Sequence, residues 1–267
     1  MDDGGGESAV LSEIVTVAET GSTNADMLAL ARSGVAEGRW LSAGRQTAGR
    51  GRQGRDWRSP VGNVSASTLV RVRPADPPAA TLALVAAVAV HETVRTFSPS
   101  PFCGFAAPPL SRREREEPPT GAAGLMLKWP NDLLLDGAKL AGILLERADD
   151  AVVVGIGVNL AHHPELADRA TTSLTAHGIT VDPAQFVMTL ADTFARWLSR
   201  WRGEGLAPVR AAWLAAAHAP GTALVARLPD GTASEGLFDG LDADGALILR
   251  LAGGERRVIH AADVFLL

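Results

Sequence analysis

Residues 45–58 contain five arginines and a single acid, Asp56, in a chain of 267 residues whose formal net charge is −5. Within this stretch the arginine loop, residues 49–58, reads Gly49-Arg50-Gly51-Arg52-Gln53-Gly54-Arg55-Asp56-Trp57-Arg58. Its glycines permit positive φ and close approach of the backbone to a ligand, and its guanidinium groups offer forked donors to phosphate or carboxylate oxygens. We therefore predict a flexible clamp for a phosphorylated small molecule; a solvated basic turn is the alternative.

The two lysines of the chain, Lys128 and Lys139, stand out among 25 basic residues. Arginine cannot replace lysine where a compact ammonium charge is needed, so we treat both as candidates for chemistry. Lys128 begins the segment Lys128-Trp129-Pro130-Asn131-Asp132, whose mixture of charged, aromatic and polar residues does not suit a hydrophobic core. We interpret it as part of a functional site; the alternative is an Asn-Asp turn after an edge strand. Lys139 begins an apolar strand with a glycine inside it, Gly142, and such a glycine often marks close approach by a ligand.

Three other motifs do not support a dinucleotide site, a P-loop or a metal site. Gly49-x-Gly51-x-x-Gly54 matches the dinucleotide fingerprint in letters, but Pro60 follows it where the fingerprint needs a helix. The sequence has no Gly-x4-Gly-Lys-Ser/Thr loop, which excludes an ordinary P-loop. We interpret His162-His163 as a surface pair rather than a metal site.

Composition excludes several classes of protein. The chain is 46% hydrophobic and long enough for one large domain plus a small one. No apolar run reaches the ~18 residues that cross a bilayer, and the acidic, glycine-rich start is no secretory signal. A single cysteine, Cys103, fits a reducing cytoplasm. The negative net charge argues against a general nucleic-acid binder.

Hydrophobic periodicity and turn residues predict an α+β protein with a mixed sheet flanked by helices. We expect a disordered terminus at 1–10, a large domain at 11–219 with a flexible, proline-rich insertion at 98–120, and a small β-barrel at 220–267. The expected strands of the large domain are 14–17, 40–44, 63–70, 125–128, 140–146 and 151–158. The expected helices are 24–32, 80–97, one that begins after Asp182-Pro183, and 208–217. The expected barrel strands are 222–228, 234–240, 246–250 and 255–260.

Five segments occur in one order and carry a resemblance. They are Glu19-Thr20-Gly21-Ser22-Thr23-Asn24, Gln46-Thr47-Ala48-Gly49-Arg50-Gly51-Arg52-Gln53-Gly54-Arg55, Lys128-Trp129-Pro130-Asn131-Asp132, Lys139-Leu140-Ala141-Gly142-Ile143 and Gly155-Ile156-Gly157-Val158-Asn159. In this combination the chain resembles the bacterial biotin protein ligases over residues 14–267. Gln53, where many relatives carry a basic residue, and the insertion at 98–120 are departures from the family pattern.

The resemblance implies a class II synthetase-like catalytic domain and a C-terminal SH3-like barrel. Because the residues before the first strand are few, glycine-rich and acidic, the resemblance is to the monofunctional type without an N-terminal DNA-binding domain. We therefore expect no DNA and no membrane among its partners.

The resemblance also implies a reaction in two steps. Biotin and ATP condense to biotinyl-5′-AMP, and a lysine of a biotin carboxyl carrier protein domain of an acyl-CoA carboxylase then attacks the mixed anhydride. Biotin and ATP are the substrates, and Mg²⁺ is expected because ATP enters as its metal complex.

Site residues follow from the same resemblance. The implied biotin-binding residues are Ser22, Thr23, Asn24, Gln46, Gly49, Arg50, Gly51, Arg52, Lys128 and Gly142. The implied ATP and adenylate residues are Arg55, Trp57, Asn131, Asp132, Lys139 and Asn159. Catalysis is expected of Lys128, Arg52 and Arg50, with Lys128 as a fixed cation at the α-phosphate.

Two other functions compete with this interpretation. A lipoate–protein ligase shares the fold and the adenylate chemistry, but the arginine loop and the Lys128–Asp132 segment favour biotin. A non-enzymatic nucleic-acid-binding module could use the arginine loop, yet it conflicts with the net charge and explains neither lysine.

Overall fold

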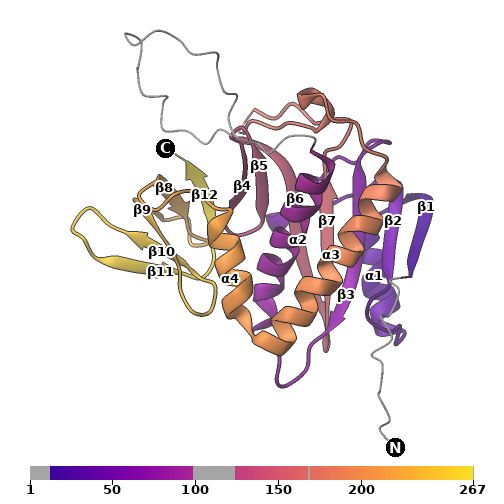
Figure 1. Ribbon diagram of the computed structural model, residues 1–267, viewed down its shortest axis with the longest axis horizontal. Helices are drawn as coiled ribbons and strands as arrows, with labels where there is room; N and C mark the ends of the chain where they lie inside the picture. Colours follow the sequence, from indigo (N-terminus) through magenta and orange to yellow (C-terminus); the bar gives the residue numbers. More distant parts are fainter. Residues whose placement is uncertain (1–12, 99–123, 168, 267) are drawn as a thin grey trace, which may run out of the picture.

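A mixed seven-stranded sheet forms the centre of the molecule in the computed structural model, which describes residues 13–98, 124–167 and 169–266 (Figure 1). The strand order is β1-β2-β3-β7-β6-β5-β4. The strands are β1 (Ile14–Thr20), β2 (Trp40–Gln46), β3 (Val64–Arg71), β4 (Leu125–Lys128), β5 (Asp132–Leu135), β6 (Ala138–Ala148) and β7 (Ala151–Val158). β1 and β2 are parallel, and every other neighbouring pair is antiparallel. The predicted terminus at 1–10, Cys103 and nearly all of the insertion at 98–120 lie outside the described residues.

Helices cover the two faces of this sheet unequally. Helices α2 (Leu82–Phe97), α3 (Pro183–Glu204) and α4 (Leu206–Ala215) pack over one face, and α1 (Thr23–Arg32) packs against β3 and β7 on the other (Figure 1). Neighbouring residues of one strand, such as Trp40 and Leu41, belong to different cores because successive strand side chains point to opposite faces. The α1 face is therefore the one with room for a site.

Helix α2 matches the expected helix at 80–97 and is mostly buried. With the turn before it, Ala79–Phe97 is long and apolar enough to cross a bilayer, but 67% of its apolar window is buried inside the protein. The aromatic side chains of α3, Phe194, Trp197 and Trp201, are buried as well. The Trp201 indole donates to Thr81 Oγ1 over 2.8 Å, which ties α3 to the start of α2. Both helices therefore supply core packing.

Strand β5 was not predicted. Its sequence, Asp-Leu-Leu-Leu, is buried at every position, and it pairs with β4 and β6. A strand that is buried on both faces shows no alternation, so periodicity alone cannot identify it. Its presence turns the segment Lys128–Asp132 into the tight connection of a hairpin.

The C-terminal residues form a second, five-stranded antiparallel sheet of order β11-β10-β9-β8-β12. Its strands are β8 (Ala223–Arg227), β9 (Ala233–Leu241), β10 (Leu247–Arg250), β11 (Arg256–Ile259) and β12 (Asp263–Leu266). Four of them match the prediction, whereas β12 was missed. Between β11 and β12 no pairing occurs in the described residues, so the sheet is open there and a closed SH3-like barrel is not confirmed.

A bidentate ion pair fastens the helical layer to the end of the sheet. The Arg202 guanidinium at the end of α3 donates to both carboxylate oxygens of Glu37 over 2.6 and 2.9 Å. Arg202 also donates to the Arg71 carbonyl, and the Arg71 backbone N–H donates to Glu37. Burial by itself would raise the pKa of Glu37, but the bonds from Arg202 and Arg71 outweigh it, and the pKa lies below its ordinary value.

We predict that Glu37→Gln lowers the free energy of unfolding at pH 7 by roughly 1.5–3 kcal/mol, the range for hydrogen bonds to charged groups. Because the folded-state pKa of Glu37 is depressed, its contribution is present above the ordinary glutamate range and is lost as pH falls through the folded-state value. In urea unfolding the deficit of the variant should therefore stay constant from pH 7 down to about 4.5, the ordinary glutamate pKa, and shrink as pH falls further. Glu92→Gln is the control, because its ion pair with Arg196 is exposed. A deficit that also stays constant at lower pH would contradict the assignment.

Candidate active site

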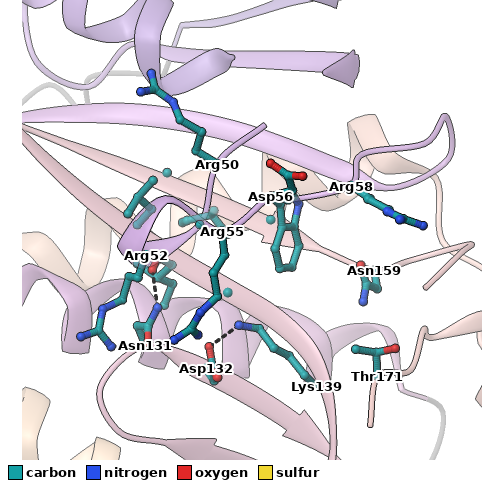
Figure 2. A pocket seen from close by; sticks show the side chains of 18 of the residues that line it. Arg50, Arg52, Arg55, Asp56, Arg58, Asn131, Asp132, Lys139, Asn159 and Thr171 are labelled. Carbon is teal, nitrogen blue, oxygen red and sulfur yellow. Dashed lines mark hydrogen bonds and ion pairs between the residues drawn. The ribbon is translucent and has the colours of Figure 1, made fainter. Parts of the chain in front are cut away.

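A cavity of about 430 Å³ lies on the α1 face of the sheet, where the arginine loop, the β4–β5 hairpin and β12 meet (Figure 2). Every site residue predicted from the sequence lines this cavity except Gly49. A Cβ atom at Gly49 would lie 2.5 Å from the Trp57 carbonyl oxygen. Gly49 therefore lets the two arms of the arginine loop approach each other, and its place among the biotin-binding residues stays a prediction.

One end of the cavity is a polar corner made of Ser22, Thr23, Asn24 and Gln46. The side-chain amide oxygen of Gln46, Oε1, accepts from both the backbone N–H and the hydroxyl of Thr23, over 2.8 and 3.1 Å. Ser22 caps helix α1 through the Ala25 N–H, so the helix start fixes three successive polar side chains. These bonds hold the corner in one arrangement.

Asn24 is fixed from both ends of its amide. Its Oδ1 accepts from Ser67 Oγ over 2.6 Å, and its Nδ2 donates to Glu146 over 2.7 Å. A Cβ atom at Gly155 would lie 2.1 Å from Asn24 Oδ1, so only glycine fits under this amide. The glycine of the Gly155–Asn159 segment thus allows the helix start to lie directly on the sheet.

Asp132 lies between the two lysines of the chain. Its carboxylate is 2.6 Å from Lys139 Nζ and 3.4 Å from Lys128 Nζ. Burial would raise the pKa of Asp132, but the two ammonium groups outweigh burial and hold the pKa below its ordinary value. Asp132 therefore remains a carboxylate and keeps both cations beside the cavity.

The arginine loop contacts the C-terminal sheet. Arg55 pairs with Asp263 at the start of β12, and Arg52 lies 3.7 Å from the same carboxylate. Arg52 also donates to Asn131 Oδ1 over 3.2 Å and to the Ala262 carbonyl. In Figure 2, Arg52 and Arg55 extend toward Asn131 and Asp132. Arg50, which we expected to take part in catalysis, points away from them.

Trp57 lies on a bare patch of the sheet. Gly142 on β6 and Gly157 on β7 are direct partners across the strand pair. A Cβ atom at Gly157 would lie 2.4 Å from the indole, and one at Gly142 would lie 3.2 Å from it. Lys139 Nζ is 5.6 Å from the centre of the indole ring, close enough for a cation–π interaction. These two cross-strand glycines thus leave the flat backbone surface on which the Trp57 indole packs.

Two residues that line the cavity each carry a buried side-chain oxygen with no partner within the described part of the chain. These oxygens are Asn159 Oδ1 and Ser65 Oγ. The Asn159 amide nitrogen is occupied by the Thr172 carbonyl, so its oxygen remains available as an acceptor. Buried polar atoms without a partner are rare in native proteins and fit a site that a polar ligand completes.

Sequence reasoning missed several lining residues. Ser65 lies in an apolar strand, where the alternation Ser65-x-Ser67 was the available signal. Leu166 and Pro164 follow Asn159 in a loop and bring apolar surface to the cavity, and Leu166 is exposed. Asp263 reaches the cavity from the other sheet, and no local pattern predicts that contact.

The charge of the cavity is mainly positive. Seven basic side chains line it: Arg50, Arg52, Arg55, Arg58, Lys128, Lys139 and Arg169. The three carboxylates that line it are Asp56, Asp132 and Asp263. Among the described residues, no group of three or more His, Cys, Asp or Glu side chains could hold a metal ion. The excess of basic side chains makes the cavity suited to an anionic ligand.

Comparisons with known proteins agree with this geometry. A model of the Biotin/lipoate A/B protein ligase family matches residues 20–160, and one of the biotin protein ligase C terminal domain matches residues 225–267. The chain is 43% identical over 261 residues to the biotin–[acetyl-CoA-carboxylase] ligase of Paracoccus denitrificans, with 93% of this chain and 98% of that protein covered. It is 36% identical to the Mycobacterium tuberculosis ligase of the same name, with 94% and 88% covered.

Solved structures show the same fold. The biotin protein ligase of Aquifex aeolicus in complex with biotin and ATP superimposes with a TM-score of 0.78 at 22% identity, over 96% of this chain and 99% of that one. The Leishmania major ligase in complex with biotinyl-5-AMP gives a TM-score of 0.60 at 25% identity, over 93% and 99%. Since a family model spans more than half of the sequence and close relatives are covered almost end to end, the chain belongs to the biotin protein ligase family.

Proposed function

We propose that this protein activates biotin with ATP as biotinyl-5′-AMP and transfers the biotinyl group to a lysine of a carrier domain. The observation that carries the proposal is the cavity itself, which joins a fixed polar corner to a cluster of lysines and arginines. Biotin has a polar ureido ring at one end and a carboxylate at the other. The cavity offers matching groups in the same order.

The polar corner is suited to the ureido ring. That ring presents one carbonyl acceptor and two N–H donors, which short hydroxyl and amide side chains can satisfy in a small pocket. Ser22 and Thr23 supply hydroxyls, and the unpartnered Ser65 Oγ supplies a third. Because the corner is already held by Gln46 and Ser67, little entropy is lost on binding.

Lys128 and Arg52 are suited to the reacting end. When the biotin carboxylate attacks the α-phosphate, negative charge builds on the phosphoryl oxygens, and fixed cations aimed there lower the barrier. Lys128 Nζ is held by the Val264 carbonyl at 3.1 Å, and Arg52 by Asn131 and Ala262. These contacts orient the cations before the substrates arrive.

The remaining part of the cavity is suited to adenine. Trp57 offers an aromatic face, and Pro164 and Leu166 offer apolar walls. Asn159 Oδ1 is the free acceptor that an exocyclic amine would satisfy. Mg²⁺ would enter bound to the triphosphate as MgATP, because the metal shields the negative charge of the phosphates.

The positive cavity also favours the second step. The carrier lysine must be uncharged to attack the anhydride, and nearby cations disfavour the ammonium form of an incoming amine. We propose a biotin carboxyl carrier protein domain of an acyl-CoA carboxylase as the acceptor, in the cytoplasm. Relatives whose names specify acetyl-CoA carboxylase as the target support this choice.

One assay separates this function from its rivals. Exchange of radiolabelled pyrophosphate into ATP should require biotin. Lipoate-dependent exchange would identify a lipoate–protein ligase. A nucleic-acid-binding module without enzymatic activity would give no exchange with either acid.

We predict that Lys128→Ala stays folded but loses about 10²–10³-fold in the rate of biotin-dependent pyrophosphate exchange, the range for removal of one electrostatic donor. The ammonium stabilises charge that exists only as the adenylate forms, so the rate should fall more than substrate affinity. Thermal melting controls for folding. Arg32→Ala, on the exposed end of α1, is the matched charge control. Near-normal exchange in Lys128→Ala would refute the role of this lysine.

A second prediction concerns the arginine loop, which we expect to close over the adenylate and shield it from water. Hydrogen exchange of residues 49–58 should slow strongly when a non-hydrolysable biotinyl-adenylate analogue binds. Asp263→Asn removes the carboxylate that pairs with Arg52 and Arg55, so protection should weaken and the KM for ATP should rise about tenfold. Asp239→Asn, which alters the β9 pairs with Arg250 and Arg256, is the control. Equal protection with and without the analogue would show a preformed loop.

A further inference from the structure

Glu146 lies on strand β6 behind the polar corner of the cavity. Its cross-strand partner on β7 is Val153, which belongs to the core under α1. Because cross-strand partners share a face of the sheet, the Glu146 carboxylate lies on the α1 side, where its Oε2 accepts from Asn24 Nδ2 over 2.7 Å. Glu146 is not among the described residues that line the cavity. An effect of this carboxylate on a ligand therefore has to pass through Asn24.

The carboxylate fixes the orientation of the Asn24 amide. An ionised carboxylate and a backbone carbonyl can only accept hydrogen bonds. Both kinds of acceptor face the same amide nitrogen, since the Leu144 carbonyl lies 3.5 Å from Asn24 Nδ2 on the same strand as Glu146. The nitrogen of the amide must therefore face β6, and its oxygen must face Ser67 on β3.

Two hydroxyl groups lie between two acceptors whose orientation is fixed. Ser67 Oγ is 2.6 Å from Asn24 Oδ1 and 2.8 Å from Thr23 Oγ1. On the other side, Thr23 Oγ1 is 3.1 Å from Gln46 Oε1, an oxygen held in place by the backbone N–H of Thr23. Each hydroxyl carries a single hydrogen. Ser67 gives its hydrogen to Asn24 Oδ1, which is the nearer oxygen and cannot donate, and Thr23 gives its own to Ser67 or Gln46.

The Thr23 hydroxyl consequently presents only lone pairs to the cavity that it lines. Its hydrogen is used inside the protein, so it can accept an N–H group of a ligand but has no hydrogen left to donate. If the Asn24 amide were turned over, its nitrogen would donate to Ser67. The Ser67 hydrogen would then go to Thr23 and occupy one of its lone pairs. The direction of every bond in this chain thus depends on Glu146.

We propose that Glu146 is a positioning residue that makes the polar corner selective for a ligand with an N–H donor, because it holds the Asn24 amide in one orientation. The inference rests on the proposed function in naming the ureido N–H of biotin as that donor. Lys128 and Arg52, which we assign to the reacting end, take no part in this chain of hydrogen bonds. Glu146 should therefore govern the affinity for biotin and leave the rate of adenylation nearly unchanged.

The test compares Glu146→Gln with Glu146→Met. Glutamine keeps an acceptor oxygen at the same reach, whereas methionine has a similar length without one. In calorimetric titrations with biotin alone, we expect Glu146→Met to raise the Kd about tenfold and Glu146→Gln to stay within about threefold of wild type. In pyrophosphate exchange the KM for biotin should rise in parallel, while the maximal rate and the KM for ATP change less than about twofold. Glu235→Met is the control, because Glu235 is an exposed strand residue of the C-terminal sheet.

A double variant separates this role from a merely structural one. Because Glu146 acts through the hydroxyl chain, Glu146→Met should weaken biotin binding by less than about twofold in a Ser67→Ala background, as residues of one hydrogen-bond network are not additive. A carboxylate that only stabilised β6 would lower the affinity by the same factor in both backgrounds. Thermal melting of each variant controls for folding.

A further readout needs neither activity nor ligand. The chain has four asparagines, so ¹⁵N-asparagine labelling gives four side-chain amide pairs in NMR spectra. The Asn24 pair is identified by its loss in Asn24→Asp. Its hydrogen exchange should become faster in Glu146→Met, since the bond to the carboxylate is gone. The Asn159 pair is the internal control, because its nitrogen donates to the Thr172 carbonyl instead.

Three results would overturn the proposal: an unchanged affinity for biotin in Glu146→Met, an equal loss in Glu146→Gln and Glu146→Met, or an undiminished effect in the Ser67→Ala background. A wild-type protein that binds no biotin would refute the proposed function instead. The exchange rate of the Asn24 amide would still decide in that case whether Glu146 fixes its orientation.

Discussion

Mutual repulsion among the cations of the cavity is the constraint that the surrounding structure must satisfy. Two unit charges 4 Å apart interact by about 4 kcal/mol at an effective dielectric constant of 20, and seven basic side chains line this one cavity. Two carboxylates offset much of that repulsion. Asp132 is paired with both lysines, and Asp263 with Arg52 and Arg55. The cavity nevertheless keeps an excess of positive charge, which an anionic substrate would offset.

The two carboxylates come from different parts of the fold. Asp132 begins β5, a strand of the central sheet, whereas Asp263 begins β12 in the C-terminal sheet. Val264, next to Asp263, also holds Lys128 through its carbonyl. The C-terminal sheet is therefore part of the active site in structural terms. Its docking decides whether the lysine and the arginine loop are aimed at the same point.

The site also requires glycines at three positions of the sheet, where other side chains pack directly against the backbone. Gly155 makes room for the Asn24 amide, and the opposed pair Gly142 and Gly157 makes room for the Trp57 indole. These glycines sit on the α1 face of the sheet, while their strand neighbours Val154 and Ile156 fill the core on the other face. The period of two in a strand thus lets one segment supply core packing and a ligand surface at once.

The sequence alone determined the chemistry of this protein, because the residue types and their order, from Ser22 to Asn159, are local properties of the chain. It also determined most strands and helices, since amphipathic periods and turn residues act over short distances. Only the tertiary structure decided which groups meet. The contact of Asp263 with the arginine loop and the bond from Lys128 to the Val264 carbonyl both depend on pairings between distant segments. Strand β5 escaped prediction for a related reason: burial on both faces is a property of the assembled sheet, and it erases the alternation that marks a strand.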